Sequence, residues 1–327
     1  MQTREVVVIT GASAGVGRAT ARAFGKRSAK VGLIARGRDG LEGAKREIEE
    51  LGGEAIVLPL DVADENAIEQ AAAEVEKTFG PIDIWVNNAM LSVFSPIMEM
   101  TPSDYRRVTE VTYLGYVWGT LAALRRMKPR DRGAIVQVGS ALAYRGIPLQ
   151  SAYCAAKHAV QGFHDSLRSE LIHDGSNVRV VMVQLPALNT PQFRWVKSRL
   201  PRKAQPVPPI FQPEVAAEAI VWAAYSGRRE TNVGWPASKA IIGNNFAPGY
   251  GDHYLAKHGY DAQMIDEPEV PGRPDNLYAP LPGDAGAHGV FDDRSTDTSI
   301  ALELNKRRGW IALGAAALLL VGFARRR

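Results

Sequence analysis

The sequence predicts an α/β fold in which a mostly parallel, doubly wound sheet is covered by helices on both faces. The chain has 327 residues, a length that favours one large domain with appendages over several full-sized domains. Hydrophobic residues make up 46% of the chain and charged residues 23%, which supplies a sizeable core and excludes a wholly disordered protein. Short strand-like runs alternate with helical patterns, and this order requires crossover connections between parallel strands.

The predicted elements follow one another along the chain. Six short apolar runs, mostly rich in β-branched residues, predict strands at Val6–Thr10, Val31–Ala35, Ala55–Pro59, Ile82–Val86, Ala134–Gly139 and Val178–Leu185. Helical patterns between these runs predict helices at about Val16–Lys26, Leu41–Leu51, Asn66–Phe79, Ser103–Met127 and Ala152–His173. One more helix is expected at Pro213–Tyr225, after a Pro-rich basic loop at Pro186–Pro209.

The rest of the chain divides into a linker and a hydrophobic tail. After a domain at 1–265, residues 266–305 are rich in Pro, Gly and Asp without a sustained apolar pattern, which predicts a flexible acidic linker. Residues 309–324 are uncharged and apolar on every side, whereas a soluble surface helix shows one polar face. With basic residues at both ends, this segment predicts a hydrophobic helix within 306–327 that anchors the chain in a membrane. It is shorter than the roughly 20 residues of a typical span, so a helix packed on the domain or on a partner chain is the alternative.

The N-terminus and the charge distribution restrict the location and the partners. No basic region followed by a long apolar core is present at the N-terminus, so no secretory signal is predicted and the main domain is expected in the cytoplasm. Arginines at both ends of the tail leave its orientation open. Residues 1–265 carry 31 Lys and Arg against 26 Asp and Glu, residues 266–304 carry 2 against 9, and residues 305–327 carry 6 against none. The basic excess therefore lies partly in the tail and is no argument for nucleic-acid binding, so no nucleic-acid partner is predicted.

The cysteine and histidine content argues against disulfides and metals. Cys154 is the single cysteine, so no internal disulfide can form, and packing is favoured over nucleophilic chemistry for its thiol. The six histidines do not cluster with cysteine or carboxylates, so no metal site is predicted.

A glycine cluster lies between the first predicted strand and the first predicted helix. Glycines in such a turn let the backbone approach a pyrophosphate closely, and the helix N-terminus supplies free N–H groups and partial positive charge. This position in the chain favours dinucleotide binding over an ordinary strand-to-helix turn. The residues expected to form the phosphate loop are Gly11, Ser13, Gly15, Val16 and Gly17.

Arg36 indicates which form of the dinucleotide is bound. In NAD-selective sites, an Asp or Glu near the end of the second strand binds the ribose 2′-hydroxyl. Here that strand ends in Ala35 and Arg36, and no carboxylate follows before Asp39. Because a guanidinium can pair with a 2′-phosphate, NADP(H) is favoured over NAD(H). The alternative is that Arg36 is a solvated surface residue.

Three residues predict a proton transfer. Tyr153 and Lys157 lie four residues apart in a predicted helix and share one face, and Ser140 follows the fifth predicted strand, at the edge where ligands bind in such sheets. A tyrosine titrates at about pH 10, but a neighbouring ammonium favours the phenolate. Lys157 is therefore expected to lower the pKa of Tyr153 toward the working range, and Ser140 to hold the substrate oxygen.

These motifs resemble those of the short-chain dehydrogenase/reductase family. The resemblance rests on Thr-Gly-x-x-x-Gly-x-Gly at residues 10–17, Gly-Ser at 139–140 and Tyr-Cys-Ala-Ala-Lys at 153–157, and it covers about residues 5–260. It implies a Rossmann-like fold and an oxidoreductase that moves a hydride between a nicotinamide and a carbonyl or secondary alcohol carbon. By the same resemblance, Tyr153 would be the acid and base, Lys157 would also bind the nicotinamide ribose, and Ser140 would position the substrate.

The resemblance implies further cofactor contacts. Asp61 and Val62 match the pair that lies beside the adenine, and Asn88 matches the family's Asn-Asn-Ala-Gly segment near the cofactor. Thr190 matches the threonine that meets the nicotinamide carboxamide. Since the family is commonly dimeric or tetrameric, the chain is expected to form a homo-oligomer.

Two residues depart from the family pattern. Met90 replaces the last glycine of Asn-Asn-Ala-Gly, and Thr112 stands where many members have an asparagine that holds a water of the proton relay. A threonine has one hydroxyl and no amide, which puts the relay in doubt. These departures motivate an alternative function, a nucleotide-binding scaffold or regulatory protein with little turnover.

The residues expected around the substrate are mostly apolar. Together with the expected anchor, they suggest a small lipophilic substrate such as a steroid, a retinoid or a long-chain ketone. The walls are expected to include Met90, Leu91, Val93, Phe94, Leu142 and Ile147. Phe193, Trp195 and Phe211 lie where the family builds its substrate lid, with ordinary packing as an equal alternative.

Overall fold

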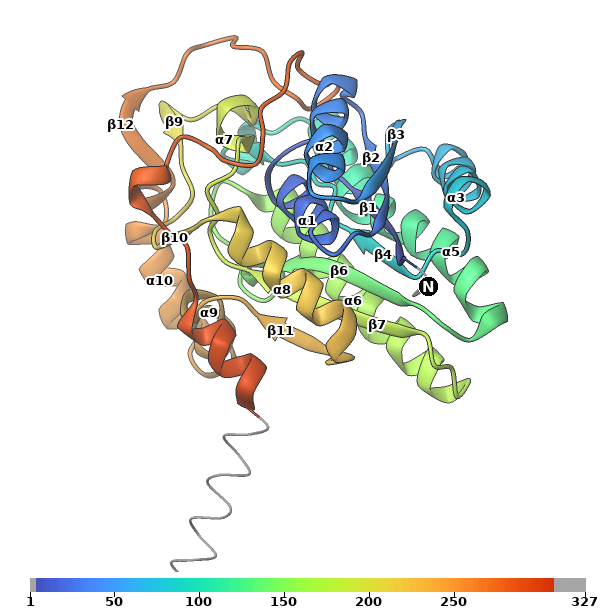
Figure 1. Ribbon diagram of the computed structural model, residues 1–327. Helices are drawn as coiled ribbons and strands as arrows, with labels where there is room; N and C mark the ends of the chain where they lie inside the picture. Colours follow the sequence, from blue (N-terminus) through green and yellow to red (C-terminus); the bar gives the residue numbers. More distant parts are fainter. Residues whose placement is uncertain (1–3, 309–327) are drawn as a thin grey trace, which may run out of the picture.

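A seven-stranded parallel sheet runs through the centre of the computed structural model, which describes residues 4–308 (Figure 1). The strand order is β11-β7-β6-β4-β1-β2-β3, and each neighbouring pair is parallel. The strands are β1 (Val6–Thr10), β2 (Lys30–Ala35), β3 (Glu54–Pro59), β4 (Ile84–Asn87), β6 (Ala134–Ser140), β7 (Arg179–Leu185) and β11 (Glu230–Asn232). The predicted doubly wound α/β class is confirmed.

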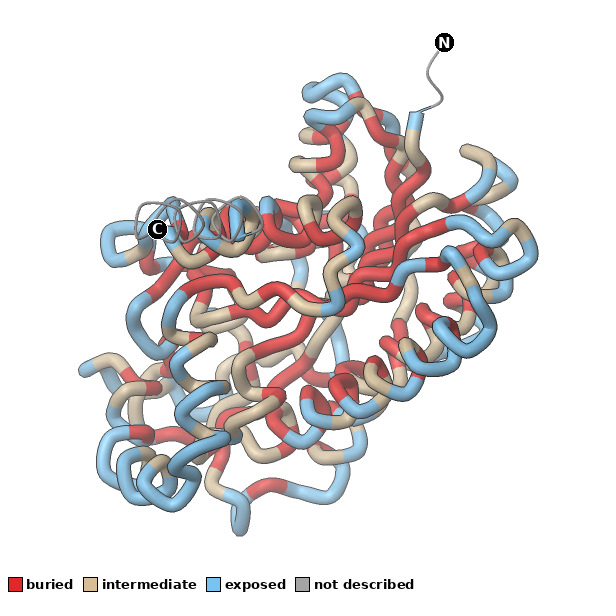
Figure 2. Tube along the Cα trace, turned by 90° about the horizontal axis from the view of Figure 1, so that it is seen from below, coloured by how far each residue is buried: buried red, intermediate tan, exposed pale blue. Residues whose placement is uncertain are grey.

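Helices cover the sheet on both faces, and each face has its own apolar cluster. Alternate residues of β1 point into the two clusters, Val7 and Ile9 into one and Val6 and Val8 into the other. Figure 2 shows the buried strands at the centre and the exposed outer sides of the helices. The helices of the first face are α1 (Gly15–Gly25), α2 (Arg38–Glu50) and α8 (Pro213–Ser226), and those of the second are α3 (Glu65–Phe79), α4 (Pro102–Thr109), α5 (Gly115–Met127) and α6 (Ser151–His173).

The position of β1 in the sheet determines where a ligand can bind. The chain continues from β1 to β2 on one side, whereas β4 lies on the other side of β1. At such a reversal of strand order, the loops at the carboxyl ends of the neighbouring strands separate and leave a crevice.

Smaller elements surround this carboxyl edge. Three short pairs of strands, β5 with β8, β9 with β12 and β10 with β13, connect loops that lie far apart in the sequence. These elements are β5 (Val93–Phe94), α7 (Gln192–Trp195), β8 (Lys197–Ser198), β9 (Arg202–Ala204), β10 (Ile210–Phe211), α9 (Trp235–Phe246), α10 (Pro248–His258), β12 (Met264–Pro268) and β13 (Ser295–Thr296). Short 3₁₀ turns lie at Ile97–Glu99, Lys128–Arg130, Ala141–Ala143, Asp261–Gln263 and Asp292–Arg294, and a π-helical turn lies at Glu110–Leu114.

The segment 266–305, predicted to be a flexible linker, packs against the domain instead. Its residues 276–291, which we call the strap, run along the carboxyl edge of the sheet near α2 (Figure 1). Leu277 of the strap is fully buried in the second apolar cluster. The Arg36 guanidinium donates hydrogen bonds to the carbonyl oxygens of Asn276, at 2.5 Å, and Leu277, at 3.3 Å. The prediction of flexibility is wrong because arginines of the domain and a few isolated apolar residues hold a segment that has no periodicity of its own.

The predicted membrane helix at 309–324 lies outside the described residues. Within residues 4–308, none of the helices combines the length and the apolar character that crossing a membrane requires.

Candidate active site

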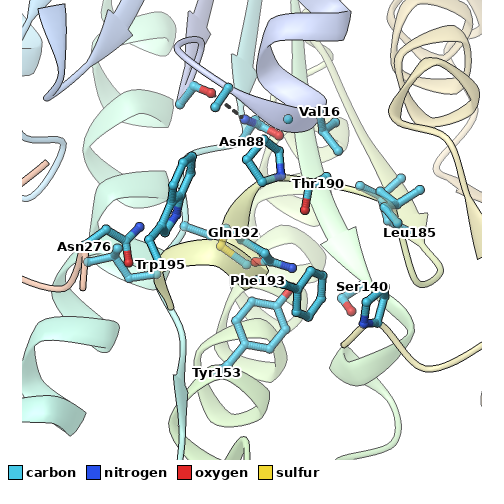
Figure 3. A pocket seen from close by; sticks show the side chains of 18 of the residues that line it. Val16, Asn88, Ser140, Tyr153, Leu185, Thr190, Gln192, Phe193, Trp195 and Asn276 are labelled. Carbon is cyan, nitrogen blue, oxygen red and sulfur yellow. Dashed lines mark hydrogen bonds between the residues drawn. The ribbon is translucent and has the colours of Figure 1, made fainter. Parts of the chain in front are cut away.

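One cavity of about 800 Å³ lies at the carboxyl edge of the sheet (Figure 3). Loops after β1, β2, β3, β4, β6 and β7 line it, and the strap lines it as well. Of the predicted site residues, it brings together Gly11, Ser13, Gly15, Val16, Arg36, Asp61, Val62, Asn88, Ser140, Tyr153, Lys157 and Thr190. Gly17 does not line the cavity but packs directly behind it.

The phosphate loop has the backbone shape for which its glycines were expected. Gly11 and Gly15 have φ values of +69° and +57°, a region that other residues rarely adopt. A Cβ added at Gly17 would lie 2.1 Å from the Gly11 carbonyl oxygen, so only glycine fits there. The loop therefore packs closely against the start of α1. The first backbone N–H groups of this helix have no partner within the helix and can bind an anion.

Asn88 ties the phosphate loop to β4. Its amide nitrogen donates to the Thr10 carbonyl oxygen at 2.9 Å, and its backbone N–H donates to the Thr10 hydroxyl at 2.9 Å. The hydroxyl of Thr10 also accepts from the backbone N–H of Ala89 at 3.1 Å. These bonds hold the ends of β1 and β4 at a fixed separation at the cavity.

Arg36 and the strap line one end of the cavity, where Arg107 contacts the strap. Arg107 pairs with Asp61 and donates to the Leu277 carbonyl oxygen at 3.0 Å, the same oxygen that accepts from Arg36. Burial lowers the pKa of Arg36, with the nearby Arg107 acting in the same direction and Asp61 opposing it. Among the described residues, Arg36 forms no ion pair with a carboxylate, so its partners here are neutral carbonyl groups.

Ser140, Tyr153 and Lys157 lie together at the other end. Ser140 ends β6, and its hydroxyl accepts from the Leu142 backbone N–H at 3.1 Å. Tyr153 and Lys157 share one face of α6, with the Lys157 Nζ 5.7 Å from the centre of the Tyr153 ring. All three residues line the same cavity, and Figure 3 shows Ser140 and Tyr153 facing it.

The pKa of Tyr153 is raised, whereas the sequence predicted that Lys157 would lower it. Burial raises the pKa of Tyr153, and hydrogen bonding with Ser140 only partly opposes this effect. Burial also lowers the pKa of Lys157 to about 7. The amine donates to the Val138 carbonyl oxygen at 2.7 Å and to the Tyr116 hydroxyl at 3.0 Å, rather than to Tyr153. A raised pKa favours the protonated phenol of Tyr153 at neutral pH.

The Thr112 hydroxyl bonds to the backbone of Leu91, and Thr112 does not line the cavity. The π-helical turn places it beside Leu91, where the hydroxyl accepts from the Leu91 N–H at 2.9 Å and donates to the Leu91 carbonyl oxygen at 2.9 Å. Thr112 is fully buried, and both contacts anchor α5 to the loop after β4. Tyr116, which lies one helical turn after Thr112 and bonds to Lys157, was not among the predicted residues, and its one signal in the sequence is an aromatic residue at that spacing.

The walls of the cavity are mostly apolar, as expected, but two of the residues predicted to line it do not. Val93 packs in the second apolar cluster and Phe211 in the first, so neither lines the cavity, whereas Phe193 and Trp195 do. The sequence did not predict the wall supplied by residues 205–208 and by α10, because these segments have no functional motif. The apolar lining residues include Met90, Leu91, Phe94, Leu142, Ile147, Phe193, Trp195, Val207 and Leu255.

The single cysteine and the histidines form no metal-binding cluster in the described part of the chain. Cys154 is buried, and burial raises the pKa of its thiol. No group of three or more His, Cys, Asp or Glu that could hold a metal occurs among residues 4–308.

Comparison with known proteins agrees with this arrangement. Residues 5–200 match the family described as short chain dehydrogenase. An uncharacterized oxidoreductase, YxnA of Bacillus subtilis (strain 168), is 34% identical over 295 residues, which cover 90% of this chain and 81% of that protein. A fatty acyl-CoA reductase of Acinetobacter baylyi is 31% identical over 67% of this chain and 72% of its own length. The crystal structure of a metagenomic short-chain oxidoreductase in complex with NADP matches with a TM-score of 0.59 at 28% identity, over 70% of this chain and 96% of that one.

Proposed function

Because the chain belongs to the short-chain dehydrogenase family and is a nicotinamide-dependent oxidoreductase, we propose that it uses NADP(H) to interconvert a carbonyl and a secondary alcohol on a lipophilic substrate. The observation that carries this proposal is the placement of Ser140, Tyr153 and Lys157 at the same cavity as the glycine loop of α1. One end of the cavity suits an anion, and the other end suits a proton transfer.

The residues at the cavity fit a phosphorylated dinucleotide. Gly11, Gly15 and Gly17 leave space at the N-terminus of α1, where a pyrophosphate finds backbone donors. The Arg36 guanidinium lines the cavity, and its hydrogen-bond partners in the described structure are neutral carbonyl groups. A ribose 2′-phosphate would give this cation an anionic partner. The structural neighbour with bound NADP supports the same cofactor.

The chemistry divides between the cofactor and three side chains. The nicotinamide, when bound, supplies or accepts the hydride. Ser140 would hold the substrate oxygen by a hydrogen bond, and the Tyr153 phenol would give a proton to that oxygen during reduction. A phenol whose pKa is raised by burial is protonated at neutral pH, which suits donation of a proton to a carbonyl. Lys157 would contribute positive charge that stabilises the phenolate left behind.

The apolar walls support a lipophilic substrate. Leu142 and Ile147 line the cavity near Ser140, and Phe193 and Trp195 from α7 close it on another side. Such walls bury hydrocarbon favourably but offer few partners to a polar chain. The relative named fatty acyl-CoA reductase acts on a substrate of this general character, which supports the same class here.

We also propose, from the sequence alone, that the tail at 309–324 attaches the enzyme to a membrane. Flotation of the full chain with phosphatidylcholine vesicles, compared with a chain ending at residue 308, tests this proposal. The cut must follow residue 308, because a cut at residue 265 would also remove the strap. Equal flotation of the two chains would contradict anchoring.

Consumption of NADPH tests the enzyme assignment. We expect turnover with a panel of hydrophobic ketones and aldehydes, and a loss of at least about 100-fold in kcat in Tyr153→Phe, because general acid catalysis contributes about 10²–10⁴-fold. Tyr144→Phe is the matched control, since the Tyr144 hydroxyl bonds to Glu230 at 2.9 and 2.8 Å, outside the cavity lining. Binding of NADPH by wild type without turnover across the panel would instead favour the nucleotide-binding scaffold.

A further inference from the structure

Lys157 is held by a second tyrosine that the family motif does not contain. The Tyr116 hydroxyl accepts a hydrogen bond from the Lys157 Nζ at 3.0 Å. The same hydroxyl donates to the Val138 carbonyl oxygen at 3.0 Å, and the amine donates to that oxygen at 2.7 Å. The three groups form a closed triangle between α5, α6 and β6.

This triangle is buried. The exposed fraction of Tyr116 is 1% and that of Lys157 is 2%. The Lys157 Nζ lies 4.6 Å from the centre of the Tyr116 ring, so the ring face as well as the hydroxyl stabilises the ammonium. An ammonium has three donors, and two are used inside the triangle, which leaves one for the cavity.

The polar residue one helical turn earlier, Thr112, cannot replace Tyr116. Both hydrogen-bonding directions of the Thr112 hydroxyl are used by the backbone of Leu91. Thr112 lies one helical turn before Tyr116, and the π-helical turn that contains Thr112 ends just before α5 begins. Position 116 is thus the point on α5 from which a side chain reaches the amine.

We propose that Tyr116 is a positioning residue for Lys157, whose hydroxyl fixes the ammonium beneath Tyr153 and keeps it charged. The inference rests on the proposed function, because it concerns the proton transfer at that site. The hydroxyl of Tyr116 ends at a backbone carbonyl, so it does not carry protons to solvent. Its effect reaches the substrate only through Lys157 and Tyr153.

The titratable groups that face the amine are few. Tyr116 faces it from α5 and Tyr153 from α6, and neither is a carboxylate. Cys154, on the same helix, contacts the Ile147 carbonyl oxygen rather than the amine. With burial acting against the ammonium, the hydroxyl of Tyr116 and the carbonyl of Val138 are its stabilising partners in the described structure.

Tyr116→Phe tests the proposal because it removes one oxygen and keeps the ring. Without the acceptor, the ammonium is less favoured, and a less charged amine leaves the Tyr153 phenol harder to ionise. We expect the oxidation rate at pH 7 to fall about tenfold, the size expected for losing a hydrogen bond to a charged group. We also expect the pH at which carbonyl reduction declines to move upward by about 0.5–1 unit.

The second readout needs neither cofactor nor turnover. NMR titration of the Lys157 side chain in the cofactor-free protein, assigned by comparison with Lys157→Arg, should show a lower pKa in Tyr116→Phe than in wild type. Tyr225→Phe is the matched control, because its hydroxyl donates to Glu5 at 2.5 Å, away from the cavity lining. Should the phenylalanine variant fold poorly, Tyr116→Met fills the space with a flexible side chain and must shift the amine in the same direction.

The outcomes separate the two proposals. A Lys157 titration and a pH profile that are unchanged in Tyr116→Phe would overturn the role of Tyr116 while leaving the enzyme assignment intact. A wild-type protein without turnover would overturn the proposed function, and the titration of Lys157 would still decide the role of Tyr116.

Discussion

Arg18 of α1 and Asp284 of the strap form a two-point ion pair across 266 residues of sequence. Nη1 of Arg18 lies 3.0 Å from Oδ1 of Asp284, and Nη2 lies 3.2 Å from Oδ2. The Arg18 side chain is 2% exposed and also donates to Glu47 at 2.8 Å and to the Gly40 carbonyl oxygen at 2.7 Å. The strap is therefore attached to both helices that follow the phosphate loop.

Asp284→Asn should loosen this attachment. Burial acts to raise the pKa of Asp284, but hydrogen bonds from Arg18 and Gly286 outweigh it and hold the pKa below its usual value. We expect a loss of about 1–2 kcal/mol in unfolding free energy at pH 7, because Glu47 still pairs with the buried guanidinium. Dissociation of NADPH, followed by stopped-flow fluorescence, should also become faster. Asp293→Asn is the control, since Asp293 is exposed and forms no ion pair in the described structure; equal effects of the two changes would refute the attachment.

Arg36→Ala should change the choice of cofactor. We expect the affinity for NADPH to fall about 10- to 100-fold while that for NADH changes less than about twofold, because only NADPH carries the phosphate that a guanidinium binds. Titration calorimetry with both nucleotides measures this. Arg38→Ala is the control, since that side chain is 64% exposed and pairs with Glu42 at 3.3 Å. An equal loss for both nucleotides in Arg36→Ala would mean that Arg36 serves only to hold the strap.

Gly17→Ala should damage the nucleotide site through packing. The added Cβ would lie 2.1 Å from the Gly11 carbonyl oxygen and 2.7 Å from the Asn88 amide nitrogen, so the backbone of the loop must move. We expect a loss of about 1–3 kcal/mol in stability and a weaker affinity for both nucleotides. Gly162→Ala in α6 has open space around the new Cβ and should be neutral or stabilise by up to about 1 kcal/mol. Thermal unfolding and nucleotide titration of the two variants give the comparison.

Asp104 should give the stability of the protein a dependence on acid pH. Its burial alone would raise its pKa, but hydrogen bonds from Lys197 and Arg199, at 2.9 and 2.6 Å, lower the pKa to about 2. A carboxyl group with a lowered pKa stabilises the fold above its unfolded pKa of about 3.9 and loses that contribution as the pH falls toward 2. We expect Asp104→Asn to cost about 2 kcal/mol or more at pH 7 and much less near pH 2. Urea unfolding at several pH values checks this, and a pH-independent difference would contradict it.

The sheet and its two layers of helices were predictable because their apolar patterns are long and regular. Val6–Thr10 was predicted with the bounds of β1, and the other five strands were predicted within about two residues. The seventh strand, β11, was missed because Glu230–Asn232 is short and polar, with only Thr231 fully buried. The helix predicted at 103–127 is interrupted by a π-helical turn at Glu110–Leu114, whose own residues include no proline or glycine.

The cavity residues that belong to a local sequence motif were predictable. Those supplied by segments distant in the sequence were not. The glycine loop and the Tyr-x-x-x-Lys spacing are local, so their residues reach one cavity as expected. The strap was read as a linker because its order comes from contacts of Arg18, Arg36 and Arg107 with its backbone and with Asp284, which no spacing along the chain reveals. Tyr116 was missed for a similar reason, since its partners, Lys157 and Val138, lie on other elements.

The strap follows every strand of the main sheet in the chain, so this cover of the cleft is synthesised after all seven of them. A protease that nicked the exposed stretch around Val270 would free one end of this cover while leaving all seven strands continuous. We expect the cut protein to keep its folded sheet and helices and to bind the nucleotide more weakly. Loss of nucleotide binding in an old or proteolysed preparation would then indicate cleavage near the strap rather than unfolding of the enzyme.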